Sequence, residues 1–227
     1  MATASVADLT ASTQNYLKAI WTLQEWSDDP VTAGRIAERV GVTTSTVSGS
    51  MAKLSEQGLV THDPYGSVDL TAKGRGLALA MVRRHRLIET FLVEMLGYGW
   101  DEVHDEAENL EHAVSDFMIE RLDEKLGRPR RDPHGDPIPD ASGDVDRPAA
   151  VRLSEVEPGQ RVLVERISDR DPDLLRFLHE QGVLPGRQVA TAAGSPFSES
   201  ISVTVAGSKT PVSLGRAATE SVFVTLA

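Results

Sequence analysis

Apolar residues recur every three to four positions over 10–26, 32–40 and 45–57, and this spacing predicts three helices. Gly41 lies between the second and third segments, where a residue in the left-handed conformation commonly ends a helix. Two short helices joined by a tight turn that contains glycine form the pattern of a helix-turn-helix. The first part of the chain therefore predicts a compact helical domain built around this motif.

Two short segments with strand-like composition, 59–62 and 67–70, follow the third helix. The residues between them, Asp63-Pro64-Tyr65-Gly66, are typical of a tight turn. A hairpin placed directly after a helix-turn-helix predicts the wing of a winged-helix domain.

Two further helices are predicted over 72–96 and over about 101–125, with Gly97 ending the first of them. Both carry wide apolar faces, and the sequence offers little else to cover those faces. Apolar surface of this extent favours an interface with a second copy of the chain, so we expect a homodimer.

The pattern changes after these helices. Residues 128–150 contain five prolines and two glycines, which indicates a linker or an extended arm. One short helix is predicted beyond it, at about 171–181. The remaining segments are rich in β-branched residues and are separated by glycine and proline; they lie at 161–167, 187–192, 200–205 and 221–226. A small β-barrel is the simplest fold for this region.

Composition limits the classes of function. The chain has no cysteine, which excludes disulfides and thiolate metal ligands. It has no apolar run long enough to cross a membrane and no basic, apolar leader, so we expect a cytoplasmic protein. The net charge of −11 argues against nucleic-acid binding by the whole surface, but the charge is uneven. Residues 101–120 carry eight acids and no Lys or Arg, whereas residues 31–75 are slightly basic. The N-terminal part can therefore still bind DNA.

The acidic segment contains a notable arrangement of side chains. His104, Glu108, Glu111 and His112 stand at i, i+4, i+7 and i+8, which places them on one face of a helix. Carboxylate oxygen and imidazole nitrogen suit a divalent cation of the first transition row. The alternative is a solvated acidic face whose histidines form local ion pairs.

Enzymatic readings fit the sequence poorly. A di-iron carboxylate site needs Glu-x-x-His pairs from two helices, and the chain has none in this region. No Gly-x-Ser-x-Gly motif is present, and no thiol nucleophile exists. We therefore predict no catalytic residues.

A series of short motifs follows one order along nearly the whole chain. They are QNYLKAIW at 14–21, IAER at 36–39, TVS at 46–48, QGLV at 57–60, LTAKGR at 70–75, RHRLIE at 84–89, VHDEA at 103–107, EH at 111–112, DPHGDPIP at 132–139 and GVLPG at 182–186. In sequence and order they resemble the diphtheria toxin repressor family of metal-dependent transcriptional repressors.

The resemblance implies a mainly α fold with a C-terminal all-β domain, divided into four parts. These are a winged helix-turn-helix DNA-binding domain at 1–74, a helical metal-binding and dimerisation domain at 75–127, a Pro-rich linker at 128–150 and a small SH3-like (FeoA-like) β-barrel at 151–227.

It also implies two neighbouring metal sites. By motif match, the primary site comprises Asn15, Glu108, Glu111 and His112. The second comprises His85, Glu89 and His104, with Asp171 contributed by the barrel.

Manganese is the expected cofactor, with Fe²⁺, Co²⁺ or other divalent ions as surrogates. The iron-dependent branch of the family usually has Cys at the position of Glu108, whereas the manganese-dependent branch has Glu. A hard carboxylate favours Mn²⁺, while a thiolate favours softer ions. Two positions depart from the manganese pattern. Asn15 replaces a carboxylate by a neutral amide, and Lys18 stands where one manganese-sensing subgroup has a second carboxylate.

The expected function is repression of metal-uptake genes by a homodimer bound to a pseudo-palindromic operator. The residues expected to face DNA are mostly short hydroxyl or basic side chains: Arg35, Arg39, Thr43, Thr44, Ser45, Thr46, Ser48 and Lys53. The alternatives are an iron-dependent repressor of the same family and, more distantly, an interaction protein that binds no metal.

Overall fold

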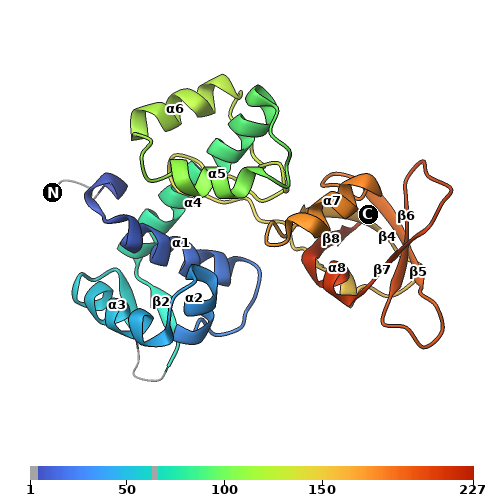
Figure 1. Cartoon of the computed structure of the whole chain (residues 1–227), viewed down its shortest axis with the longest axis horizontal. Coiled ribbons are helices and arrows are strands. Elements are labelled where there is room, and N and C mark those ends of the chain that lie inside the picture. The colour runs from blue at the N-terminus through green and yellow to red at the C-terminus, as the bar shows by residue number, and fades with distance from the viewer. Residues whose placement is uncertain (1–4, 63–65) are drawn as a thin grey trace. The chain divides into compact units, whose positions relative to one another are not determined.

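Figure 1 shows a computed structural model of the chain, which describes residues 5–62 and 66–227. The chain divides into two compact units. The first comprises Met1–His85, Asn109–Ile119 and Pro139–Asp144, and the second comprises Arg86–Glu108, Glu120–Ile138 and Val145–Ala227. Most of the turn predicted in the wing, residues 63–65, lies outside the described residues. Among those that are described, no helix has the length and the apolar composition needed to cross a membrane.

The first unit contains the predicted winged helix-turn-helix. Its elements are η1 (Val6–Asp8), α1 (Ala11–Glu25), α2 (Ala33–Val40), α3 (Thr44–Glu56), β1 (Val60–His62) and β2 (Val68–Leu70). Side chains of Thr32 and Thr43 cap α2 and α3, and Gly41 ends α2 with a φ of 73°. The two strands pair antiparallel. The three helices, the turn at Gly41 and the two paired strands of the wing are therefore confirmed.

The first unit has a well-packed apolar core. Leu17, Ile20, Ile36, Val47 and Met51 are all fully buried. They come from α1, α2 and α3 and follow the helical spacing that predicted these elements. Their burial holds the outer face of α3 at a fixed position on the domain.

The long predicted helix is present as α4 (Ala72–Leu96). The prediction of a single acidic helix over 101–125 is wrong in one respect. This segment is divided into α5 (Val103–Leu110) and α6 (Asp116–Lys125). Arg84, which is buried, donates to the carbonyl of Val114 at 2.5 Å and to that of Glu111 at 3.4 Å, and it pairs with Asp116. A side chain from α4 thus satisfies carbonyl groups that the break leaves without helical partners.

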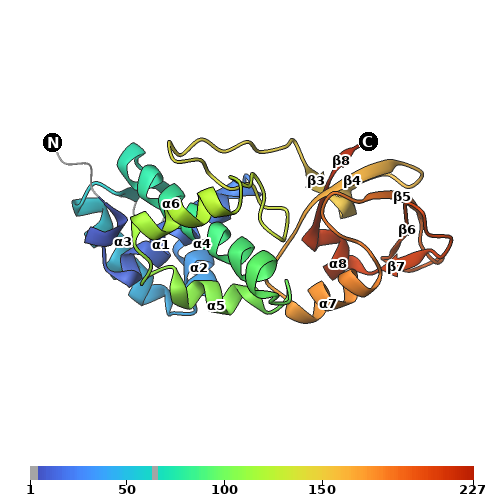
Figure 2. The same ribbon diagram turned by 90° about the horizontal axis from the view of Figure 1, so that it is seen from above.

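The C-terminal part of the second unit is a six-stranded antiparallel sheet with the order β3-β8-β4-β5-β6-β7 (Figure 2). Its elements are β3 (Val151–Arg152), η2 (Leu153–Glu155), β4 (Arg161–Ile167), α7 (Pro172–Glu180), β5 (Gln188–Ala193), β6 (Ile201–Val205), β7 (Val212–Leu214), α8 (Arg216–Ser221) and β8 (Val222–Leu226). The predicted all-β domain is confirmed. Three elements, β3, β7 and α8, could not be predicted from the sequence, because each is too short to show a clear period.

The segment predicted as a linker folds against the sheet at one point. His134 accepts a hydrogen bond at its carbonyl from the backbone of Ile167 in β4, at 2.9 Å. Gly135 has a φ of 89°, and a Cβ there would lie 2.1 Å from the carbonyl oxygen of Glu165. Only glycine allows this close approach of the two backbones. The loop from Asp132 to Asp136 is therefore an ordered part of the second unit.

Candidate metal centres

The carboxylate of Glu111 is the centre of a cluster in the first unit. Glu111 is fully buried. Its Oε1 lies 2.5 Å from Lys18 Nζ, and its Oε2 lies 2.7 Å from His85 Nδ1. Both partners are themselves buried. The predicted second-site residue His85 therefore lies beside a carboxylate that we assigned to the primary site.

His112 is held in a defined orientation by Gln14. Gln14 Nε2 donates to the carbonyl oxygens of Val6 and Leu9, at 2.8 and 3.3 Å. The amide oxygen of Gln14 must therefore accept from His112 Nδ1, which lies 2.6 Å away. This arrangement leaves His112 Nε2 available as a ligand, and Nε2 lies 3.8 Å from Glu111 Oε1. A hydrogen bond to one imidazole nitrogen commonly orients a metal-binding histidine in this way.

Asn15 offers a further ligand atom from α1. It lies between Gln14 and Lys18, which contact His112 and Glu111. Its Oδ1 is buried and has no hydrogen-bond partner among the described residues. A buried carbonyl oxygen without a donor is costly, and a cation removes that cost. The residues of this cluster thus fit a divalent ion.

Glu108, the remaining predicted primary ligand, belongs to the second unit. Its Oε1 lies 3.6 Å from His104 Nε2, one turn earlier on α5. The other nitrogen of His104, Nδ1, lies 3.0 Å from Asp169 Oδ2 and 3.4 Å from Glu89 Oε1. The ligand atoms of Glu89, His104 and Asp169 lie within 4.8 Å of one another, a spacing suited to one cation.

Asp171, the ligand predicted from the barrel, has a different role in the structure. Its Oδ1 accepts from the backbone of Asp173 at 3.0 Å and of Leu174 at 3.1 Å, and so caps the N-terminus of α7. Asp171 is exposed. The carboxylate that reaches His104 is that of Asp169, two residues earlier. Asp169 is therefore the carboxylate of the barrel that lies beside His104, while the assignment of Asp171 as a ligand stays a prediction.

The loop before the barrel adds a second group around Glu89. Ligand atoms of Glu89, Asp132 and His134 also lie within 4.8 Å of one another, and all three residues are buried. His134 Nε2 donates to the carbonyl oxygen of Trp100 at 2.6 Å, which leaves Nδ1 facing Glu89 Oε2 at 3.8 Å. This Nδ1 is buried without a hydrogen-bond partner. The sequence did not indicate either loop residue as a ligand, because the Pro-rich segment shows no periodicity that marks a buried side chain.

Negative charge dominates the second unit's cluster. Burial lowers the pKa of His104, but the hydrogen bonds and charges of Asp169 and Glu89 raise it more, to about 10. Burial also lowers the pKa of His134, and Glu89, Asp132 and Asp169 raise it, again to about 10. Burial and the neighbouring carboxylates raise the pKa of Asp132. Protons therefore neutralise part of a charge that a divalent cation can also neutralise.

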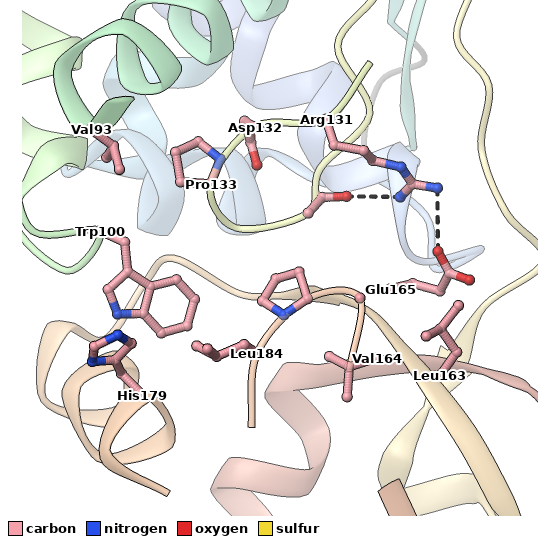
Figure 3. Close-up of a pocket in the computed structure, with 13 residues that line it drawn as sticks. Val93, Trp100, Arg131, Asp132, Pro133, Leu163, Val164, Glu165, His179 and Leu184 are labelled. Atoms are coloured by element: carbon pink, nitrogen blue, oxygen red, sulfur yellow. Dashed lines mark hydrogen bonds and ion pairs between the residues drawn. The ribbon is translucent and has the colours of Figure 1, made fainter. Parts of the chain in front are cut away.

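A cavity of about 560 Å³ adjoins this cluster (Figure 3). Asp132 lines it together with Trp100, His179 and Leu184. Trp100 stacks on His134, with ring centroids 5.7 Å apart, and also contacts His179 at 6.0 Å. The cavity brings solvent to the edge of an otherwise buried set of ligand atoms.

The predicted DNA-facing residues lie mainly on α3 and on the turn before it. Thr44, Ser45 and Ser48 are exposed, and so is Lys53. The hydroxyl of Ser48 donates to the carbonyl of Thr44 at 3.0 Å. Two of the other predicted residues serve the local fold. Thr43 caps α3 and forms hydrogen bonds with the hydroxyls of Ser45 and Thr46. Arg35 donates to the carbonyls of Asp29 and Pro30. Arg39 is partly exposed on α2.

Three protein families match the chain. Residues 8–68 match "Iron dependent repressor, N-terminal DNA binding domain", residues 71–140 match "Iron dependent repressor, metal binding and dimerisation domain", and residues 151–226 match the FeoA domain. The chain is 38% identical over 202 residues to the iron-dependent repressor IdeR of Mycobacterium leprae (strain TN), covering 83% of this chain and 86% of IdeR.

Solved structures are also similar over almost the full length. A manganese-dependent transcriptional repressor in complex with manganese is 52% identical, with a TM-score of 0.90, covering 95% of this chain and all of that one. The manganese regulator SloR is 32% identical, with a TM-score of 0.78, covering 96% of this chain and all of SloR.

Proposed function

Because the chain belongs to the diphtheria toxin repressor family of metal-dependent transcriptional repressors, we propose that it is a manganese-activated repressor of metal-uptake genes. Proteins of this family are regulators and not enzymes. The chain carries the family's DNA-binding and dimerisation domains, so it acts on operator DNA as a homodimer. Membership of the family does not fix the identity of the metal, the ligand residues or the symmetry of the operator, and these are proposed below.

The chemistry of the ligand atoms supports manganese. The cluster in the first unit offers the Asn15 amide oxygen, the Glu111 carboxylate and the His112 imidazole, and the motif adds the Glu108 carboxylate. The chain has no cysteine, so no thiolate can enter either site. Oxygen and imidazole ligands suit Mn²⁺, whereas thiolate ligands select softer ions. The similarity to a manganese-dependent repressor supports the same choice.

Iron is the second candidate, and one observation favours it. The relative IdeR of M. leprae, which is 38% identical to this chain, is an iron-dependent repressor by name. Fe²⁺ follows Mn²⁺ directly in the affinity series and accepts the same oxygen and nitrogen ligands. The two ions must therefore be compared directly.

The geometry of α1 supports a switch. This helix belongs to the winged-helix domain, and its Gln14 and Lys18 contact His112 and Glu111, with Asn15 between them in the sequence. An ion bound by Asn15, Glu111 and His112 fixes α1 against residues 111–112. Such an ion favours whichever conformation holds these ligands together, by as much as its affinity for the two conformations differs.

A second site is proposed around Glu89. Its candidate ligands form two groups that share Glu89: Glu89 with His104 and Asp169, and Glu89 with Asp132 and His134. These residues reach it from α4, α5, the Pro-rich loop and the barrel. We propose that an ion here holds the loop and the barrel to the helices, while the ion at the primary site controls DNA binding.

The operator is proposed to be pseudo-palindromic, since a homodimer with a two-fold axis presents two identical winged helices. Lys53 and Arg39 supply phosphate contacts, and the short hydroxyl side chains of α3 allow close approach to the groove. We propose a cytoplasmic location, which agrees with the DNA-binding domain of the chain.

The observation that carries the proposal is the buried, unpartnered Oδ1 of Asn15 on a helix of the DNA-binding domain. The direct test is a gel-shift or anisotropy titration with promoter DNA and Mn²⁺, anaerobic Fe²⁺ or no ion. We expect tight binding with Mn²⁺, loss of binding with a chelator and weaker activation by Fe²⁺. Equal DNA affinity with and without metal would contradict the switch, and stronger activation by Fe²⁺ would favour the iron candidate.

A further inference from the structure

Lys18 is a buried lysine beside the candidate metal ligands of the first unit. Only 8% of Lys18 is exposed, whereas Lys53, Lys73, Lys125 and Lys209 all lie on the surface. Taking an ammonium group out of water is costly unless an opposite charge compensates it. The compensating group is Glu111, whose Oε1 lies 2.5 Å from Lys18 Nζ.

Both oxygens of Glu111 are engaged in the structure. Lys18 contacts Oε1 and His85 contacts Oε2 at 2.7 Å. No third oxygen exists for an ion, and a protonated lysine has no lone pair with which to become a ligand itself. An ion that takes Glu111 as a ligand must therefore share or displace one of these two contacts.

Charge decides which contact changes. The imidazole of His85 can itself become a metal ligand, whereas the ammonium group of Lys18 lies against the carboxylate oxygen that a divalent cation would take. Two cations that compete for one buried carboxylate repel each other strongly because the surrounding protein screens little. The side chain of Lys18 is long and flexible, and it lies at the edge of the cluster with 10% of its surface exposed. It can move toward solvent while Glu111 stays in place.

We propose that Lys18 is a built-in competitor of the metal ion: its ammonium group holds Glu111 until an ion displaces it. Lys18 thereby raises the metal concentration at which the repressor responds. The inference rests on the proposed function, because it takes Glu111 as a metal ligand.

The first test compares Lys18→Met, which keeps the length of the side chain and removes its charge, with the wild-type protein. The Mn²⁺ dissociation constant is measured by competition with a chelating dye. We expect Lys18→Met to bind Mn²⁺ about tenfold more tightly or better, a change that corresponds to about 1.4 kcal/mol. Lys209→Met is the matched control for loss of one distant, exposed lysine, and Lys18→Arg keeps a charge that can pair with Glu111. Both variants should have a Mn²⁺ dissociation constant close to that of wild type.

The urea midpoint of unfolding provides a measurement that does not depend on DNA binding. Without metal, Lys18→Met removes the ammonium group from the buried Glu111 carboxylate, so the urea midpoint of the variant should fall below that of wild type. Saturating Mn²⁺ should then raise the midpoint of Lys18→Met by more than it raises that of wild type. An equal increase in both proteins, or weaker Mn²⁺ binding by the variant, would show that Lys18 supports the site rather than competing for it.

The second test needs no variant. Wild-type protein is acetylated with and without saturating Mn²⁺, and each lysine is quantified by mass spectrometry. Lys18 should react slowly without Mn²⁺ and faster with it, while the four exposed lysines serve as internal references. Continued protection of Lys18 at full Mn²⁺ occupancy would overturn the proposal. Failure of wild type to bind Mn²⁺ in the dye assay would instead count against the proposed function, so the two failures are distinguishable.

Discussion

Gln14 and His112, 98 positions apart in the chain, are joined by a hydrogen bond of 2.6 Å between the Gln14 amide oxygen and His112 Nδ1. The carbonyls of Val6 and Leu9 fix the direction of the amide, and the amide in turn fixes the tautomer of the imidazole. Gln14 therefore positions a candidate ligand although its own side chain donates nothing to a metal.

Replacing Gln14 tests this relationship. Gln14→Met should weaken Mn²⁺ binding about 10- to 100-fold, as is typical when a partner that orients a ligand is removed. The dissociation constant from dye competition is the measurement. Gln181→Met, at an exposed position in the barrel, should leave that constant unchanged. A variant of Gln14 with normal Mn²⁺ affinity would mean that His112 does not depend on this bond.

A substitution at Glu108 tests whether the chemistry of this ligand selects Mn²⁺. A thiolate at this position should favour softer ions over Mn²⁺, so Glu108→Cys should gain affinity for Zn²⁺ or Fe²⁺ relative to Mn²⁺ by about tenfold or more. Parallel titrations with each ion under anaerobic, reducing conditions measure the ratio. Glu106→Cys, at another acidic position on α5, controls for the introduction of a thiol. An unchanged ratio would remove Glu108 from the ligand set.

Alanine variants of Asp169 and Asp171 distinguish a metal ligand from a residue that caps a helix. Asp169→Ala should lower metal affinity at the second site, because its carboxylate lies 3.0 Å from His104 Nδ1. Asp171→Ala should leave metal binding unchanged and cost about 1 kcal/mol of stability through loss of the cap on α7. Metal titration and urea unfolding of both variants give the two readings. The reverse pattern would restore Asp171 as the ligand.

Gly135 tests whether the Pro-rich loop must lie against β4 for the second site to form. Gly135→Ala places a Cβ 2.1 Å from the carbonyl oxygen of Glu165, so the loop that carries Asp132 and His134 should move away. We expect loss of second-site metal binding, measured as metal stoichiometry by mass spectrometry of the native protein. Gly159→Ala is a matched control, since Gly159 also has a positive φ but has nothing within 4 Å of its Cβ position. If both variants bind metal equally well, the packing of the loop does not matter for the site.

Much of the fold could be predicted from local sequence. Thr32 and Thr43 cap their helices, Gly41 ends α2, and the apolar spacing of α1 to α4 matches the observed elements. These signals act within a few residues, so they survive without knowledge of the tertiary structure. The helix predicted over 101–125 failed because its break depends on Arg84, which comes from another helix and satisfies the carbonyls of Glu111 and Val114.

By itself, the sequence determined the kinds of ligand atoms available, but not that α5 ends at Leu110, before Glu111 and His112. Oxygen and imidazole nitrogen without any thiolate, arranged at His104, Glu108, Glu111 and His112, already indicated a divalent cation. Only the tertiary structure decided which atoms meet. It placed Lys18 against Glu111 and brought Asp169, rather than Asp171, to His104. Spacing along one helix fixes which side chains share a face, but contacts between distant segments depend on how separate elements pack, and no local pattern encodes that packing.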